Sequence, residues 1–141
     1  MFIPDVNVLI YAHRAESIKH EEAAKLITDL ANSESPFGLS ELVASAFIRV
    51  LTNPKSYKPT SSLDTCLEFL GRLIACDNCI LLRPGESHWK IFTQLCYDTR
   101  IKGKLIADAY HAALAIENSA TWITADPDFA KFGKFLKWEL I

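Results

Sequence analysis

Four acidic side chains lie where predicted strands give way to helices, at Asp5, Glu41, Asp108 and Asp126. Like charges raise one another's pKa, so carboxylates that share a site need a compensating cation. Hard divalent ions such as Mg²⁺ prefer oxygen ligands and take one or two carboxylates together with waters. In phosphodiester hydrolysis such ions hold the phosphate, lower the pKa of the attacking water and stabilise the leaving oxygen. The residue types therefore indicate metal-assisted chemistry on a phosphate ester, without a nucleophile from the protein.

The elements that would position these acids alternate along the chain. Short apolar segments predict strands at residues 2–4, 37–39, 79–83, 121–124 and 135–140. Apolar residues at helical spacing predict helices after Asp5 and over residues 17–32, 41–51, 62–75, 88–99 and 105–118. Ser61 or Ser62 and Ser87 are the predicted caps of two of these helices. Strands separated by helices are typical of a parallel sheet with right-handed crossovers. The sequence thus predicts an α/β fold, a three-layer α/β/α sandwich around a short, mainly parallel sheet of four or five strands.

Three of the four acids follow the carboxyl ends of predicted strands. In an open α/β sheet, ligands bind at that edge. We therefore expect Asp5, Glu41 and Asp126 to meet there, although Asp5 and Asp126 are 121 residues apart in the chain (126 − 5). Asp108 stands in an otherwise apolar stretch, where an acid without a partner is unusual.

Each acid also has an ordinary structural explanation. Asp5 could be a helix N-cap, and Glu41 stands in a first helical turn, where the helix dipole favours an acid. Asp126 and Asp128 flank a proline in a segment that resembles a turn, where aspartate is common. The group of acids carries more weight than any single member.

Composition limits the kind of protein. The 141 residues are half hydrophobic, which suits one globular domain over residues 1–141. Fifteen Lys and Arg nearly balance 17 Asp and Glu, which excludes a strongly basic nucleic-acid sleeve but not a nucleic-acid substrate. No apolar run approaches the roughly 18 residues of a membrane span. The first residues lack the basic region of a signal peptide, so we expect a cytoplasmic protein without membrane attachment.

The four cysteines do not indicate a metal site. Cys76 and Cys79 have the spacing of a redox pair or of half a zinc site. A structural zinc ion needs further ligands, and the chain has no second such pair. We expect free thiols in a reducing compartment.

Four short motifs resemble those of one known family. Asp5-Val6-Asn7-Val8-Leu9 resembles the opening D-x-N-x-L motif of PIN-domain proteins. The segments 39–42 and 47–54 resemble the second block of the VapC toxins within that family, and 106–115 resembles their third block. Residues 124–129, Thr-Ala-Asp-Pro-Asp-Phe, resemble the T-x-D-x-D-F block. The motifs occur in the family's order and span the chain, so the resemblance is specific.

The resemblance implies a metal-dependent endoribonuclease that hydrolyses RNA phosphodiester bonds with Mg²⁺ or Mn²⁺. Asp5, Glu41, Asp108 and Asp126 match the family's catalytic and metal-binding acids. Asp128 matches a further acid that would also bind metal, and Asn7 and Thr124 match polar residues that support the site. It also implies a toxin of a toxin–antitoxin system, which pairs with a VapB-type antitoxin and forms a homodimer.

RNA must be held as well as cut, and basic and aromatic side chains can bind phosphates and bases. Two basic clusters are candidates, Arg100, Lys102 and Lys104, and Arg49, Lys55 and Lys58 with Tyr57. A third basic series is interpreted as a solvated face: Lys131, Lys134 and Lys137. His111 follows Asp108 by three residues and could contact the site, but more often such a histidine is structural. Six aromatic residues should divide between the core and a partner surface: Trp89, Phe92, Trp122, Phe129, Phe132 and Phe135.

Other classes of protein also begin with an aspartate after the first strand. A haloacid-dehalogenase-type phosphatase needs a second aspartate two residues later, where this chain has Asn7. A receiver domain needs an acidic pair near the first strand, which is absent at Asp5. A catalytically degenerate PIN-like scaffold that binds protein, or another RNA-processing nuclease, remains as the alternative.

Overall fold

The computed structural model describes residues 1–141, and a sheet of five parallel strands forms its centre. The strands are β1 (Phe2–Pro4), β2 (Phe37–Ser40), β3 (Cys79–Leu82), β4 (Thr121–Thr124) and β5 (Trp138–Leu140). Their order is β3-β2-β1-β4-β5, and every neighbouring pair is parallel. In the central register, Phe2 lies opposite Phe37 on one side and Thr121 on the other. The predicted parallel sheet is confirmed.

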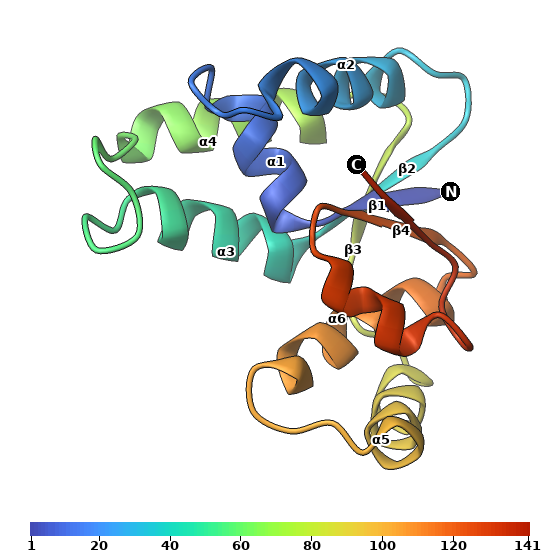
Figure 1. Cartoon of the computed structure of the whole chain (residues 1–141). Coiled ribbons are helices and arrows are strands. Elements are labelled where there is room, and N and C mark those ends of the chain that lie inside the picture. Colours follow the sequence, from blue (N-terminus) through green and yellow to red (C-terminus); the bar gives the residue numbers. More distant parts are fainter.

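Helices cover both faces of this sheet (Figure 1). They are α1 (Val6–His13), α2 (His20–Ala31), α3 (Glu41–Leu51), α4 (Leu63–Ile74), α5 (His88–Thr99), α6 (Leu105–Glu117) and the 3₁₀ helix η1 (Pro127–Phe132). In Figure 1, α1 to α4 lie on one side, and α5, α6 and η1 lie on the other. Helix α1 packs against α2 and α3, whereas α5 packs against α6 and η1. The predicted three-layer α/β/α sandwich is confirmed.

The direction of the chain explains the two layers. From β1 the chain moves outward to β2 and then to β3, and after β3 it returns to β4 and moves outward to β5 on the opposite side. Right-handed crossovers place the connecting helices of opposite directions on opposite faces. The direction reverses between β1 and β4, which makes this the topological switch point, where open α/β sheets bind their ligands.

Aromatic side chains fill much of the core, and 28 buried hydrophobic residues form one connected cluster. Trp122, Phe129 and Phe132 are buried in it, so these three are core residues. Trp89 and Phe135 are 66% and 46% exposed, which leaves them free to meet a partner. No helix of the fold has both the length and the apolar character that a membrane crossing requires.

Two local predictions are wrong. The last strand begins at Trp138 rather than at residue 135, because the N–H groups of Phe135 and Leu136 bond to the carbonyl of Phe132 in a turn that follows η1. Ser87 does not cap α5 with its side chain, and its backbone N–H instead donates to Glu117 Oε1 at 3.0 Å. Elsewhere the predicted helices and strands agree with the structure to within a few residues.

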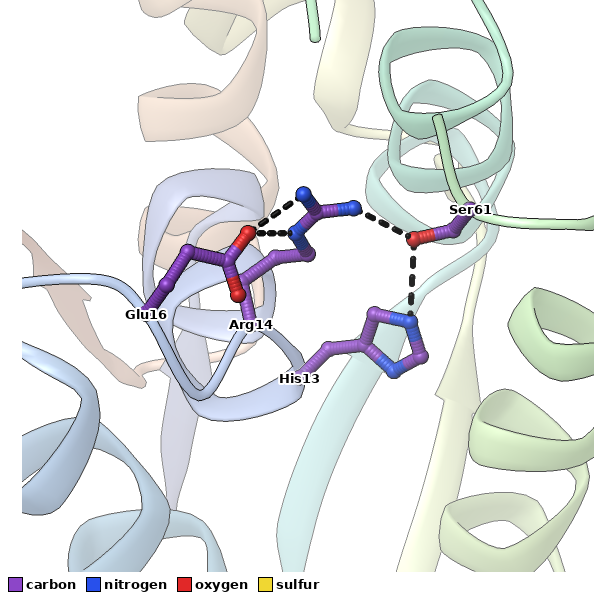
Figure 2. A network of polar contacts seen from close by, with 4 residues as sticks. All are labelled: His13, Arg14, Glu16 and Ser61. Atoms are coloured by element: carbon purple, nitrogen blue, oxygen red, sulfur yellow. Dashed lines mark hydrogen bonds and ion pairs between the residues drawn. The ribbon is translucent and has the colours of Figure 1, made fainter. Parts of the chain in front are cut away.

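A partly buried polar network lies at the carboxyl end of α1 (Figure 2). Arg14, the C-cap residue of α1, is 7% exposed. Its Nε donates to Glu16 Oε1 at 2.5 Å, and its Nη1 donates to Ser61 Oγ at 3.1 Å. Nε2 of His13 lies 3.3 Å from the same hydroxyl. Figure 2 shows the guanidinium between the Glu16 carboxylate and Ser61, so this network joins the end of α1 to the segment between α3 and α4.

Candidate active site at the carboxyl edge of the sheet

Asp5 is the most buried acid of the site, with 5% of its surface exposed. It follows β1 directly and caps α1, because its Oδ1 accepts from the N–H of Val6 at 2.6 Å. Its backbone N–H donates to the carbonyl of Ile123 in β4 at 2.8 Å, which fixes the residue between the two central strands. Asp5 is therefore both a helix cap and a member of the acidic group.

Asn7 and Thr124 support the other oxygen of this carboxylate. Thr124 Oγ1 donates to Asp5 Oδ2 at 2.6 Å, and Asn7 Nδ2 donates to the same oxygen at 2.9 Å. Asn7 Oδ1 also accepts from the N–H of Ala125 at 2.9 Å, so the amide joins the start of α1 to the end of β4. Thr124 is fully buried, and its hydroxyl accepts from the N–H of Asp126 at 3.0 Å. The two residues predicted as supporting thus orient Asp5 and the first residues after β4.

Asp126 and Asp128 follow β4 at the start of η1. Asp126 caps η1, because its Oδ1 accepts from the N–H of Asp128 at 2.9 Å. The Asp128 carboxylate forms an ion pair with Lys104 at 3.0 Å. The hydrogen bond from Lys104 lowers the pKa of Asp128. Asp128 therefore already has a cationic partner, whereas no ion pair reaches Asp126.

Asp108 lies in the first turn of α6, so this acid comes from the helical layer that α6 forms with α5 and η1. It is half-buried, and burial raises its pKa. The charges of Asp126 and Asp128 add to this rise, and the charge of Lys104 opposes it. Burial likewise raises the pKa of Asp5 to about 6 against its hydrogen bonds, and the charge of Asp108 adds to this rise. Asp108 is thus within electrostatic reach of Asp5, Asp126 and Asp128. A cation among them would reverse the rise in pKa at Asp5 and Asp108.

Glu41, like Asp128, has its own ion-pair partner. It opens α3 after Ser40, and its carboxylate forms an ion pair with Arg83 at 2.6 Å. The hydrogen bond from Arg83 lowers the pKa of Glu41. Arg83 directly follows β3, so two neighbouring strands deliver the pair to the same edge of the sheet. Sequence reasoning did not identify Arg83, although its place at the carboxyl end of a predicted strand was a signal for it.

The donor set fits a hard divalent ion. The four acids supply only oxygen ligands, and the buried Asp5 has no cationic partner among the ion pairs of the chain. In the structure, however, no three such side chains converge closely enough to form a metal cage. Mg²⁺ keeps several waters and needs only one or two carboxylates. Asp5, Asp108 and Asp126 are therefore the residues that would hold the ion. Glu41 would join them only if its ion pair with Arg83 were broken.

The other predicted residues lie outside this group. Arg49 is in the last turn of α3, about 12 Å along the helix axis from Glu41, and the segment with Tyr57 follows that helix. The ring of Tyr57 is also covered by the guanidinium of Arg14 at 5.4 Å. His111 stacks on Trp122 at 5.3 Å between ring centroids, and burial lowers its pKa to about 4. His111 is therefore a neutral core residue.

Comparisons with known proteins identify the family. The PIN domain family model matches residues 2–135. The chain is 44% identical over 138 residues to VapC ribonuclease Mb2897 of Mycobacterium bovis, with 98% of this chain and 93% of that protein covered. The same identity and coverage hold for ribonuclease VapC43 of Mycobacterium tuberculosis. The chain also shares its fold with the solved structure of VapBC-1 from nontypeable Haemophilus influenzae, with a TM-score of 0.70, 15% identity and coverage of 99% and 96% of the two chains. The chain therefore belongs to the PIN-domain family, within its VapC branch.

Proposed function

We propose that this protein is a metal-dependent endoribonuclease that hydrolyses RNA phosphodiester bonds as the toxin of a VapBC-type pair. The observation that carries the proposal is Asp5, a buried carboxylate without a cationic partner, held at the switch point of the sheet. Burial alone would favour the protonated acid. A divalent ion bound beside Asp5 would stabilise the charged form of this buried carboxylate.

The residues of the chain divide the work. Asp5, Asp108 and Asp126 would bind Mg²⁺ or Mn²⁺, and Glu41 and Asp128 would complete the site from its two sides. When bound, the ion supplies charge stabilisation for the phosphate and acidifies water. Thr124 and Asn7 fix one oxygen of Asp5, so this carboxylate enters the reaction already oriented. Neither residue needs to touch the RNA.

Three further assignments belong to the same proposal. The VapBC-1 structure that shares this fold supports a VapB-type antitoxin as partner. Exposed apolar side chains on α4 and β3 support contacts with other chains, including a homodimer: Leu63, Leu67, Ile74, Ile80 and Leu81. The four free cysteines suit a reducing compartment such as the cytoplasm. We treat residues 1–141 as one domain, because one sheet and one buried cluster run through them.

Cleavage of a mixed RNA pool tests the proposed activity. Purified protein is incubated with Mg²⁺, with Mn²⁺ and with EDTA, and Asp108→Asn is purified in parallel to exclude a contaminating nuclease. We expect cleavage with metal that is lost both in EDTA and in the variant. Cleavage by Asp108→Asn at the wild-type rate would contradict the assigned site. If the wild-type protein cuts no RNA in a pool that includes structured RNAs, the protein-binding scaffold becomes the better reading.

A further inference from the structure

A basic cavity lies beside the acidic site, between the α5–α6 segment and the end of η1. Its volume is about 830 Å³, within the roughly 300–1,000 Å³ of small-ligand pockets. Arg100 and Lys102 line it from one side, and Lys131 and Lys134 line it from the other. In the sequence these four cations belong to two separate basic series, and the fold brings both series to one cavity. We call this space the Arg100–Lys134 pocket.

The charges of the Arg100–Lys134 pocket are uncompensated. Four cations and one acid, Asp98, line it, an excess of three positive charges (4 − 1) in a chain whose net charge is −2. None of the four cations forms an ion pair. Asp98 instead accepts from Gln94 Nε2 at 2.9 Å. A cluster of like charges in one concave space attracts an anion.

The backbone holds one of these cations in place at a cost. Arg100 ends α5 in the left-handed conformation, with φ of 50°, where glycine or asparagine is the usual residue. Its guanidinium lies over the ring of Tyr97 at 4.3 Å, a cation–π contact that orients it. Gly103 takes a positive φ of 63° three residues later and shapes the same turn. Two residues with positive φ thus shape the segment from which Arg100 and Lys102 line the pocket.

The pocket also offers apolar surface beside the cations. Phe135, 46% exposed, and Ile101 both line it. An exposed aromatic ring among cations matches a nucleotide, since the ring can stack on a base while the cations hold phosphates. An acidic peptide would use the charges and leave the ring without a flat partner.

The pocket and the acidic site share two chain segments. Lys104, in the same turn as Lys102, forms the ion pair with Asp128. Asp128 and Lys131 belong to the same six-residue η1. The segments that line the pocket therefore also carry residues of the acidic site, which suits a single RNA strand as the common ligand of both.

We propose that the Arg100–Lys134 pocket is a nucleotide subsite, in which a flanking phosphate of single-stranded RNA lies against Arg100, Lys102, Lys131 and Lys134 and the adjoining base stacks on Phe135. This inference rests on the proposed nuclease function and names where its substrate is held. The subsite binds RNA before and independently of the cleavage step.

The test is a binding titration that needs no cleavage. A fluorescein-labelled ten-nucleotide RNA of mixed sequence is titrated in Mg²⁺ with the cleavage-deficient Asp108→Asn chain, and anisotropy is followed over a series of salt concentrations. Adding Lys131→Gln with Lys134→Gln should weaken binding about tenfold and lower the slope of log K against log salt by about 1.4, because each contact to a single strand contributes about 0.7. Phe135→Ala should weaken binding roughly 5- to 100-fold, whereas Phe135→Tyr keeps a stacking ring and should bind like the parent.

Lys25→Gln with Arg72→Gln is the matched control, because it removes the same charge from exposed cations on α2 and α4. Binding unchanged in the pocket variants, equally weakened in the control, or absent in the parent would overturn the inference. Binding of a hexaglutamate peptide as tight as that of RNA would also overturn it and point to an acidic protein partner. In the wild-type background, the pocket variants should raise KM with little change in kcat. If metal-dependent cleavage is intact and the pocket variants change neither RNA binding nor KM, the subsite is wrong and the nuclease function is still supported.

Discussion

The two ends of α1 each carry a buried charge, and they differ in what surrounds it. Asp5 precedes the helix and Arg14 follows it, so both charges have the sign that the helix dipole favours. Arg14 has Glu16 as an ionic partner and Ser61 as a hydrogen-bond acceptor. Asp5 has hydrogen bonds but no cation, and its charged neighbour is Asp108. We call the Arg14 end complete, because its charge is paired, and we expect it to stabilise the fold. We call the Asp5 end incomplete, because its charge has no cationic partner, and we expect it to bind a ligand.

The largest expected effect is on activity at the incomplete end. Asp5→Asn should lower single-turnover cleavage at least about 100-fold, since even residues that only orient a metal ligand contribute about 10- to 100-fold. The fold should remain intact, because the amide still caps α1. Cleavage by Asp5→Asn at the wild-type rate would show that Asp5 does not belong to the active site.

Removing a support of Asp5 should have a smaller effect. Thr124→Val keeps the shape of this buried residue but deletes the hydroxyl that donates to Asp5 Oδ2. We expect cleavage to fall about 10- to 100-fold and metal affinity to weaken, as for other residues that orient a ligand. Thr124→Ser, which retains the hydroxyl, is the control and should keep most of the activity. Equal losses in both variants would indicate a packing defect in place of an orienting role.

At the complete end, the expected change is in stability. Arg14→Gln removes the guanidinium from Glu16 and Ser61 and should lower the free energy of unfolding by about 2 kcal/mol, in the range for hydrogen bonds to charged groups. Cleavage per folded molecule should not change. Chemical denaturation and single-turnover cleavage measured on the same preparation separate the two quantities. A loss of cleavage without a loss of stability would contradict this assignment and give Arg14 a role in activity.

The pH dependence of stability sharpens the comparison without RNA. The raised pKa of Asp5, about 6 against 3.8, means that its contribution to the stability of the metal-free protein is full below pH 3.8 and is lost as pH rises through 6. Asp5→Asn should therefore be more stable than the metal-free wild type above pH 6, by up to about 3 kcal/mol, and should lose this advantage towards pH 4. Its own stability should fall between pH 6.5 and 4, because the unfolded chain then takes up a proton at His111 that the fold excludes. Denaturation midpoints from pH 4 to 8 in EDTA test both signs, and an advantage of Asp5→Asn that is constant across this range would contradict them.

The smallest expected effect on stability is at the exposed ion pair of the site. Arg83→Gln releases Glu41, but exposed pairs contribute little, so the free energy of unfolding should hardly change. Metal affinity should rise or stay the same, because Glu41 no longer has to leave a cation. Calorimetric titration with Mn²⁺ measures this, and a clear loss of affinity would give Arg83 a supporting role.

The sequence predicts the layers and much of the site, because strand ends, breakers and caps are local signals. Asp5, Asn7, Thr124 and Asp126 come together as expected once β1 and β4 are neighbours. The contacts that sequence reasoning missed depend on packing between distant segments. Arg14 meets Ser61 across 47 residues. The pairing of Glu41 with Arg83 follows from the order of β2 and β3, which periodicity does not reveal.

The central claim is that Asp5 binds a divalent ion together with Asp108 and Asp126. The most direct measurement is the stability of the protein as a function of the metal-ion concentration. Ligand binding to the folded state alone adds about 2.7 kcal/mol at a concentration of about 100 times Kd. We expect Mg²⁺ and Mn²⁺ to raise the unfolding midpoint of the wild type and of Arg14→Gln, and to leave that of Asp5→Asn nearly unchanged. Equal stabilisation of wild type and Asp5→Asn, or no stabilisation of either, would contradict the account.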